Sequence, residues 1–266
     1  MSDATSGTLL VTVDSLRADV LGPTVTPTLD GLAAEATTFE RCFAHGNWTP
    51  FAFPSILGSD PVFTDGPGVG LSDGPALAEV LSDAGVATAG FNAANGFLTE
   101  FWDYDRGFDE FESFVDDGGG RYSKYLAAHP TVAGWLQLAA SPFRRVADVL
   151  RRRERKPFVD VSHGWDVEQR ATAFLEDVDG PFFCWVHYMD AHTPYVPAPK
   201  HVQAVDADHM NLLTRLRAHV HTGLGWDVGD DTLAALRSLY RGTVHQIDAS
   251  VGRLLATLEE TGLRDD

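Results

Sequence analysis

Apolar residues form two short, nearly unbroken runs along the chain, Thr8–Val13 and Pro181–Tyr188. Each run is too short and too uniform for the face of a helix, and both are rich in β-branched or aromatic residues. Such runs are typical of strands buried on both faces of a mainly parallel sheet. Weaker patterns predict further strands at Thr38–Phe43 and Val86–Phe91.

Helical periodicity fills the stretches between these strands. It predicts helices over Pro27–Thr37, Pro75–Ala84, Asp166–Leu175, 206–222 and 230–261. Strands that alternate with helices indicate an α/β fold. A chain of 266 residues, 44% of them hydrophobic, can form one large domain over residues 1–266 with its own core.

Residues 116–160 are expected to form a helical insertion in this domain. The segment opens with Asp-Asp-Gly-Gly-Gly and ends in the basic run Arg151–Lys156. That run is the only strongly positive stretch of the chain, and two interpretations of it stay open. It is either a solvated helix face or a contact for an anionic partner.

The charge balance narrows the classes of partner. The net charge is −18, and only three residues are lysines, so nucleic acid is not expected to bind through a general basic field. An Asp-rich, Lys-poor composition is typical of proteins from salt-loving organisms, with an ordinary acidic protein as the alternative. We find no signal core and no window apolar enough to span a bilayer, so we expect a cytoplasmic protein. Cys42 and Cys184 lie in apolar runs and are expected to be buried free thiols.

Polar side chains follow the predicted strands where they end. Asp14 follows the first run, Thr49 follows a Gly-Asn exit from the second strand, and the fourth strand leads into His187, Asp190 and His192. In open α/β sheets, ligands bind at these carboxyl ends. Asp14 or Thr49 as a plain helix cap is the alternative for each residue alone.

Together these groups favour ester chemistry. An acid and a hydroxyl could share a divalent cation, which would lower the pKa of the hydroxyl and make it a nucleophile. A helix N-terminus at Thr49 would favour an anion. A histidine opposite could hold the anionic group or protonate the leaving oxygen. The set suits transfer or hydrolysis of phosphate or sulfate esters.

The same residues belong to an ordered series of motifs that resembles the sulfatase family of the alkaline phosphatase superfamily, and especially haloarchaeal sulfatase-like proteins. The matching segments are Leu9–Asp19, Thr26–Ala33, Asn47–Thr49, Phe53–Leu57, Gly107–Phe111, His187–Tyr195 and Tyr240–Asp248 running into Gly252–Leu255. The resemblance covers nearly the whole chain. It implies a large, mainly parallel sheet between helical layers.

The resemblance also implies roles for the polar residues. Asp14 would be the first metal ligand, and Thr49 would stand at the nucleophile position beside the metal. His192 would contact the substrate anion, with His187 and Asp190 lining the site. One or two divalent cations would be bound, with calcium, zinc and manganese as the candidates.

Three departures from the family pattern shape the expected function. Thr49 replaces the Cys or Ser that family members oxidise to formylglycine, so phosphoester chemistry is favoured over formylglycine-type sulfatase chemistry. Asp14 is followed by Ser15 where a second acid is expected. The sequence ends at Asp266, before the strand and Asp-His pair expected to complete the metal site.

The third departure predicts a fragment, half of a split gene or a degenerate remnant, with the sheet completed by a missing segment or a partner. Two functions therefore stay open: a metal-dependent hydrolase or transferase of sulfate or phosphate esters, and a truncated, inactive binding or scaffold protein. A nucleotide-binding α/β protein is disfavoured because no Gly-rich phosphate loop follows the first strand.

Overall fold

The computed structural model describes residues 7–60, 69–115, 162–205, 217, 220 and 227–264. The predicted insertion over 116–160, with its basic run Arg151–Lys156, lies outside these residues, as does most of the predicted helix over 206–222.

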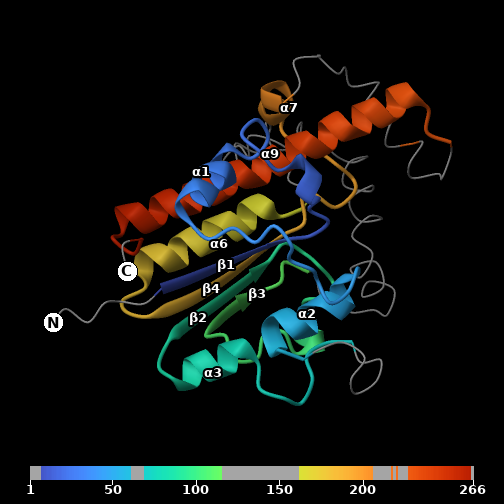
Figure 1. Cartoon of the computed structure of the whole chain (residues 1–266). Helices are drawn as coiled ribbons and strands as arrows, with labels where there is room; N and C mark the ends of the chain where they lie inside the picture. The colour runs from blue at the N-terminus through green and yellow to red at the C-terminus, as the bar shows by residue number, and fades with distance from the viewer. Residues whose placement is uncertain are drawn as a thin grey trace, which may run out of the picture.

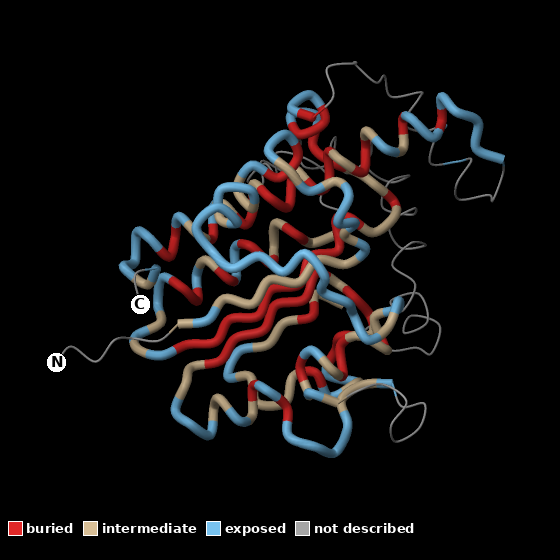
Figure 2. The backbone as a smooth tube through the Cα atoms, in the orientation of Figure 1, coloured by how far each residue is buried: buried red, intermediate tan, exposed pale blue. Residues whose placement is uncertain are grey.

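The centre of the fold is a four-stranded sheet in which every pairing is parallel. Its strands are β1 (Gly7–Val13), β2 (Ala87–Asn92), β3 (Glu110–Glu112) and β4 (Phe182–Tyr188), in the spatial order β1-β4-β2-β3. All seven residues of β4 are buried, as its continuous apolar run predicts. Figure 2 shows this buried centre in red.

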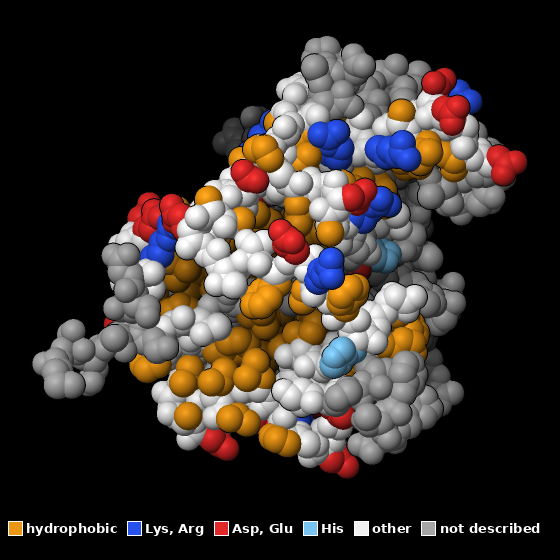
Figure 3. All heavy atoms as spheres, viewed as in Figure 1, with side chains coloured by type: hydrophobic (Ala, Val, Ile, Leu, Met, Phe, Trp, Pro, Cys, Tyr) orange, Lys and Arg blue, Asp and Glu red, His pale blue; other side chains and the backbone are white. Residues whose placement is uncertain are grey.

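β1 differs from the expectation that both of its faces are buried. Among the described residues it pairs only with β4, so it forms one edge of the sheet. Thr8 is exposed, and the other residues of β1 are of intermediate exposure. Figure 3 shows apolar side chains at the surface in a band where Figure 1 places β1.

Helices cover both faces of the sheet (Figure 1). One layer contains α1 (Pro27–Glu35), α6 (Gly164–Asp177) and α9 (Asp230–Glu260), which pack on Cys184, Val186 and Tyr188 of β4. The other contains α2 (Thr49–Gly58) and α3 (Leu77–Asp83), which pack on Phe183 and Trp185. The short elements are η1 (Ala18–Val20), η2 (Glu100–Trp102) and α7 (Pro199–Val205).

This arrangement confirms the predicted α/β fold with a parallel sheet between helical layers. The alternation of side chains along β4 explains both cores, because successive residues point to opposite faces. It also places His187 on the α2 side and Tyr188 on the α9 side.

The predicted strand at Thr38–Phe43 is wrong. The segment has no strand structure, and Phe39 and Phe43 are 77% and 83% exposed. A strand needs a neighbour to satisfy its backbone groups, and none of the described strands pairs with this segment. Cys42 lies within it and is exposed, so the expected burial holds for Cys184 alone.

The described helices are those of a protein domain packed around a sheet. None of them combines the length and the apolar character that a bilayer span requires.

Candidate functional site

Asp14 lies at the carboxyl end of β1, as predicted. Its backbone N–H donates to the carbonyl of Tyr188 at 2.9 Å, which extends the pairing of β1 with β4 by one residue. Ser15 then takes a left-handed backbone conformation, with φ of 56°. The Ser15 hydroxyl donates to Asp14 Oδ1 at 2.8 Å. This leaves Asp14 Oδ2 directed at Thr49 and Asn95.

Thr49 is the first residue of α2, and its side chain does not cap the helix. The N-cap position belongs to Trp48, and the Thr49 hydroxyl instead donates to Asp14 Oδ2 at 3.0 Å. The predicted proximity of this acid and this hydroxyl is therefore present, across 35 residues of sequence. Because α2 begins here, the positive end of its dipole lies beside the hydroxyl.

Asn95 joins these two residues, although the sequence analysis did not single it out. Its Nδ2 lies 3.2 Å from Asp14 Oδ2 and 3.4 Å from Thr49 Oγ1. The side chain is 2% exposed, and Asn92 at the end of β2 holds its backbone by accepting from Asn95 N at 3.0 Å. The signal that could have found Asn95 is its place just after the end of β2, since Asp14 likewise follows the end of β1.

His187 is fully buried beside Asn95. Its Nδ1 lies 2.9 Å from the hydroxyl oxygen of Thr12. The single proton of that hydroxyl is donated to the Val186 carbonyl, at 3.3 Å. With that proton committed, Nδ1 is the donor and Nε2 is a bare acceptor. Nε2 faces Asn95 Nδ2 at 3.4 Å and Asp14 Oδ2 at 3.8 Å.

Burial lowers the pKa of His187 to about 4, although the nearby carboxylate of Asp14 acts in the opposite direction. His187 is therefore neutral near pH 7. The site then contains one carboxylate, one hydroxyl, one amide and an uncharged imidazole.

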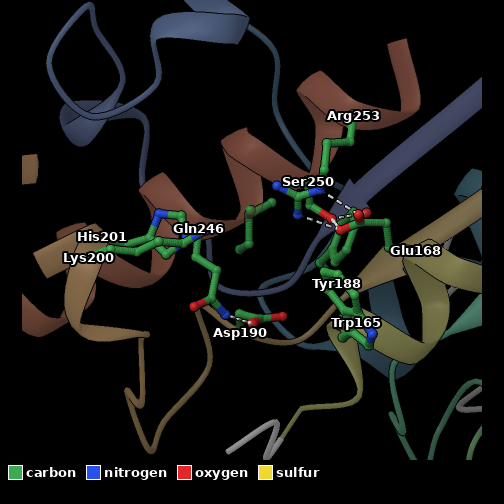
Figure 4. Close-up of a pocket in the computed structure, with 11 residues that line it drawn as sticks. Trp165, Glu168, Tyr188, Asp190, Lys200, His201, Gln246, Ser250 and Arg253 are labelled. Atoms are coloured by element: carbon green, nitrogen blue, oxygen red, sulfur yellow. Dashed lines mark hydrogen bonds and ion pairs between the residues drawn. The ribbon is translucent and has the colours of Figure 1, made fainter. Parts of the chain in front are cut away.

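The described hydrogen bonds of Asp190 and His192 are made to residues other than Asp14, Thr49 and His187. Asp190 Oδ1 accepts from Gln246 of α9 at 2.8 Å, and Asp190 lines a pocket with residues of α6, α7 and α9 (Figure 4). His192 is partly exposed, and its Nδ1 lies 2.9 Å from the Thr193 carbonyl. The structure thus brings Asp14, Thr49 and His187 together, and places Asp190 on the α9 side of the sheet.

The donor set suits a divalent cation in kind. Asp14 offers a carboxylate oxygen, Thr49 a hydroxyl oxygen and His187 a bare imidazole nitrogen, which are the ligand types of zinc and manganese. Among the described residues, no group of three or more His, Cys, Asp or Glu side chains is arranged to hold a metal ion. These residues alone do not form a complete metal site.

The parallel sheet between helices makes this chain an α/β domain, and open α/β domains bind ligands at the carboxyl ends of their strands. The family model that matches is Sulfatase, over residues 7–266. The chain therefore belongs to the sulfatase family, as its motifs indicated.

Three relatives illustrate the comparison. The chain is 28% identical over 123 residues to the multifunctional alkaline phosphatase superfamily protein PehA of Trinickia caryophylli. The aligned segment covers 37% of this chain and 24% of that protein. The phosphonate monoester hydrolase of Agrobacterium radiobacter has a similar fold, with a TM-score of 0.66, 17% identity, and coverage of 98% of this chain and 60% of that one. The C-terminal periplasmic domain of EcEptC from Escherichia coli, in complex with Zn, has a TM-score of 0.56 and 14% identity, covering 97% of this chain and 60% of that one. This chain spans less than two thirds of each relative.

Proposed function

We propose that this chain carries the nucleophile of a hydrolase or transferase that acts on sulfate or phosphate esters, with Thr49 in that role. The observation that carries the proposal is the hydrogen bond from Thr49 Oγ1 to Asp14 Oδ2, made at the first residue of α2. A hydroxyl becomes a useful nucleophile when a neighbouring group accepts its proton. Asp14 is placed to accept that proton.

Phosphoesters are the favoured substrates. A threonine cannot be converted to formylglycine, so the route that family members use for sulfate esters is closed to this residue. Direct attack by Thr49 Oγ1 on phosphorus would form an O–P bond and pass the hydroxyl proton to Asp14. The ester O–P bond would break, and its oxygen would leave as a phenolate or as an alkoxide that takes a proton from solvent. Water would then hydrolyse the phosphothreonine. The phosphonate monoester hydrolase with the same fold is consistent with this choice.

Asn95 and the helix start would stabilise the anion. Asn95 Nδ2 is a buried donor 3.4 Å from Thr49 Oγ1, close to where an attacked phosphoryl group would carry its negative oxygens. The positive end of the α2 dipole favours the same charge. His192 is proposed to contact the substrate anion, and His187 is proposed to line the site.

A divalent cation is part of the proposal. Asp14 and Thr49 would hold it, with His187 Nε2 near enough to contribute, and the cation would supply charge neutralisation and a lower hydroxyl pKa. The zinc-bound relative of the same fold supports this proposal. Zinc, manganese and calcium are the candidates.

The decisive experiment compares Thr49→Ala and Thr49→Ser with the exposed control Thr24→Ala. Turnover of p-nitrophenyl phosphate, bis-p-nitrophenyl phosphate and p-nitrophenyl sulfate is measured with Mn²⁺, Zn²⁺ or Ca²⁺. We expect Thr49→Ala to lose roughly a thousandfold or more in kcat, while Thr49→Ser and the control keep measurable turnover.

Mass spectrometry of a quenched reaction should find the phosphoryl group on Thr49. Wild-type turnover by Thr49→Ala would remove this residue from the nucleophile role. A wild-type chain that cleaves none of these esters with any of the three cations would contradict the proposed activity itself.

A further inference from the structure

The long helix α9 carries polar side chains that the proposed chemistry does not use. The segment Tyr240–Asp248 is one of the motifs of the sequence series, yet none of its residues has been assigned a role. Figure 1 shows α9 running along one face of the sheet. Its apolar side chains, among them Val244, Ile247, Val251 and Leu254, join the main core. The polar groups of Tyr240 and Gln246 are not needed for that packing.

Tyr240 holds the turn that follows Asp14. Its hydroxyl donates to the Ser15 carbonyl at 2.8 Å and accepts from the Arg17 backbone N–H, also at 2.8 Å. The side chain is 7% exposed, and the two contacts span 225 and 223 residues of sequence. One hydroxyl therefore satisfies an acceptor and a donor on either side of a single residue, Leu16.

The turn needs this support because Ser15 has a left-handed backbone, with φ of 56°. A non-glycine residue keeps such a conformation only when its surroundings enforce it. Loss of the Tyr240 hydroxyl would free the turn to relax. Asp14, one residue earlier, would then move relative to Thr49.

Gln246 holds the loop between β4 and α7 in a comparable way. Its Nε2 donates to Asp190 Oδ1 at 2.8 Å, and its Oε1 accepts from the Ala198 backbone N–H at 2.9 Å. Figure 4 shows Gln246 reaching from α9 toward Asp190. Both ends of the loop that carries His192 are thereby bound to one buried amide.

The two loops also meet at Tyr240. The Tyr195 ring, from the β4–α7 loop, lies edge-on to the Tyr240 ring, with centroids 5.2 Å apart and planes at 69°. α9 thus contacts both the turn after Asp14 and the loop that carries His192.

We infer that Tyr240 and Gln246 are positioning residues for the ester-cleaving site. Tyr240 fixes the turn that orients Asp14 toward Thr49, and Gln246 fixes the loop that presents His192 to the substrate anion. The inference rests on the proposed function for its catalytic consequence. The holding contacts themselves can be tested without any turnover.

The first test measures backbone amide hydrogen exchange in Tyr240→Phe and Gln246→Leu. Tyr240→Phe removes one hydroxyl and keeps the ring against Tyr195, and we expect Arg17 N–H to exchange at least about tenfold faster. Gln246→Leu should do the same to Ala198 N–H. The matched control is Tyr188→Phe, which removes a hydroxyl that lies 2.9 Å from Ser250 Oγ on α9 and should leave both amides unchanged.

The second test measures Mn²⁺ affinity and steady-state kinetics on p-nitrophenyl phosphate. We expect Tyr240→Phe to weaken Mn²⁺ binding and to lower kcat by about tenfold to a hundredfold, because a misdirected Asp14 affects both. Gln246→Leu should chiefly raise KM and leave Mn²⁺ affinity intact. A purely structural role would lower the melting temperature without this division between kcat and KM.

Three results separate the outcomes. Unchanged exchange at Arg17 in Tyr240→Phe overturns the inference. If Tyr240→Phe exchanges faster at Arg17 but keeps the Mn²⁺ affinity, kcat and KM of wild type, the inference is also overturned, because holding the turn would then have no effect on catalysis. A wild-type chain with neither Mn²⁺ binding nor turnover refutes the proposed function, and faster exchange at both amides would still support the holding contacts.

Discussion

At the scale of single residues, the site is defined by which groups carry charge. Asp14 lies beside His187, whose pKa is lowered to about 4 by burial. His187 is therefore neutral near pH 7. A protonated His187 would form an ion pair with Asp14 and compete with any cation for the carboxylate. The neutral form leaves both Asp14 Oδ2 and His187 Nε2 available as acceptors.

This neutrality predicts a pH dependence of stability. In the unfolded chain His187 regains its ordinary pKa of 6.5, so between about pH 6.5 and 4 the unfolded state binds a proton that the folded state does not. The free energy of unfolding should therefore fall as the pH is lowered through this window, by up to about 3 kcal/mol for this residue. Urea unfolding at several pH values, in the presence of a chelator, measures it.

The matched variant for this measurement is His187→Gln, which cannot titrate and should flatten the pH dependence. His201 has its pKa lowered to about 4 by burial and by Lys200, so part of the slope should remain until His201→Gln is added. An equally steep slope in the double variant would contradict the assignment.

The sequence predicted three of the four residues that converge at the site. Asp14 follows β1 and His187 lies near the end of β4, so the strand-end rule selects both of them. Thr49 was predicted from the exit of a strand that is absent, and its place at the site comes from the start of α2. Asn95 lies in an aromatic-rich stretch whose pattern indicates packing. Its place at the site depends on the hydrogen bond from its backbone N–H to Asn92 Oδ1, which no local pattern predicts. Asp190 and His192 follow β4 along the sequence, but the side chain of Asp190 turns toward α9. Sequence order does not specify which way a loop residue points.

At the scale of elements, several helices depend on side chains that are remote in sequence. α1 begins at Pro27, as predicted, but the hydroxyl of the preceding Thr26 does not cap the helix and instead bonds to Gly22. The free N–H groups of Thr28 and Leu29 are capped by Asp248 of α9, at 3.0 and 2.9 Å. A local pattern gives the helix boundary correctly, but it cannot identify a cap 220 residues away.

The strands show the same limit more strongly. β2 and β4 could be predicted because their apolar residues indicate burial without any knowledge of the neighbouring strands. Thr38–Phe43 has residues suited to a strand but no pairing partner among the described strands, and strand formation depends on that partner.

An ion pair between α6 and α9, in which the carboxylate is buried and the guanidinium is 45% exposed, gives a prediction at this scale. Glu168 is 6% exposed, and it accepts from Arg253 Nε at 2.5 Å and Nη2 at 2.6 Å, and from Ser250 Oγ (Figure 4). Arg253→Met would leave the Glu168 carboxylate short of partners in a buried place. We expect a loss of about 2–3 kcal/mol in the free energy of unfolding, measured by urea titration.

Two comparisons make this prediction specific. The double variant Glu168→Gln/Arg253→Met should lose less than Arg253→Met alone, because no charge is left behind. Arg237→Met, on an exposed part of α9, should stay within about 0.5 kcal/mol of wild type. Equal losses in Arg253→Met and the double variant would show that packing, and not charge, holds the two helices together.

At the scale of the whole molecule, the parallel sheet and its two helical layers could be predicted from the alternation of apolar strands and helices. The position of each strand in the sheet could not. β1 was expected in the interior because its residues are apolar, and among the described residues it lies at the edge. The opposite edge, β3, is short and carries Glu110 and Glu112, which pair with Arg170.

The unequal edges have a consequence for how the purified chain behaves at high concentration. An edge strand without charge, proline or bulge is a template for pairing with another chain, and β1 has none of these protections. The net charge of −18 keeps copies apart at low ionic strength, and salt screens that repulsion. Colloidal stability should therefore fall as salt is added, which dynamic light scattering over a salt series can follow. In wild type we expect the measured particle size to grow with salt, and Thr8→Lys, at the exposed position of β1, should suppress that growth. The control Thr24→Lys makes the same change in charge away from β1 and should associate as wild type does.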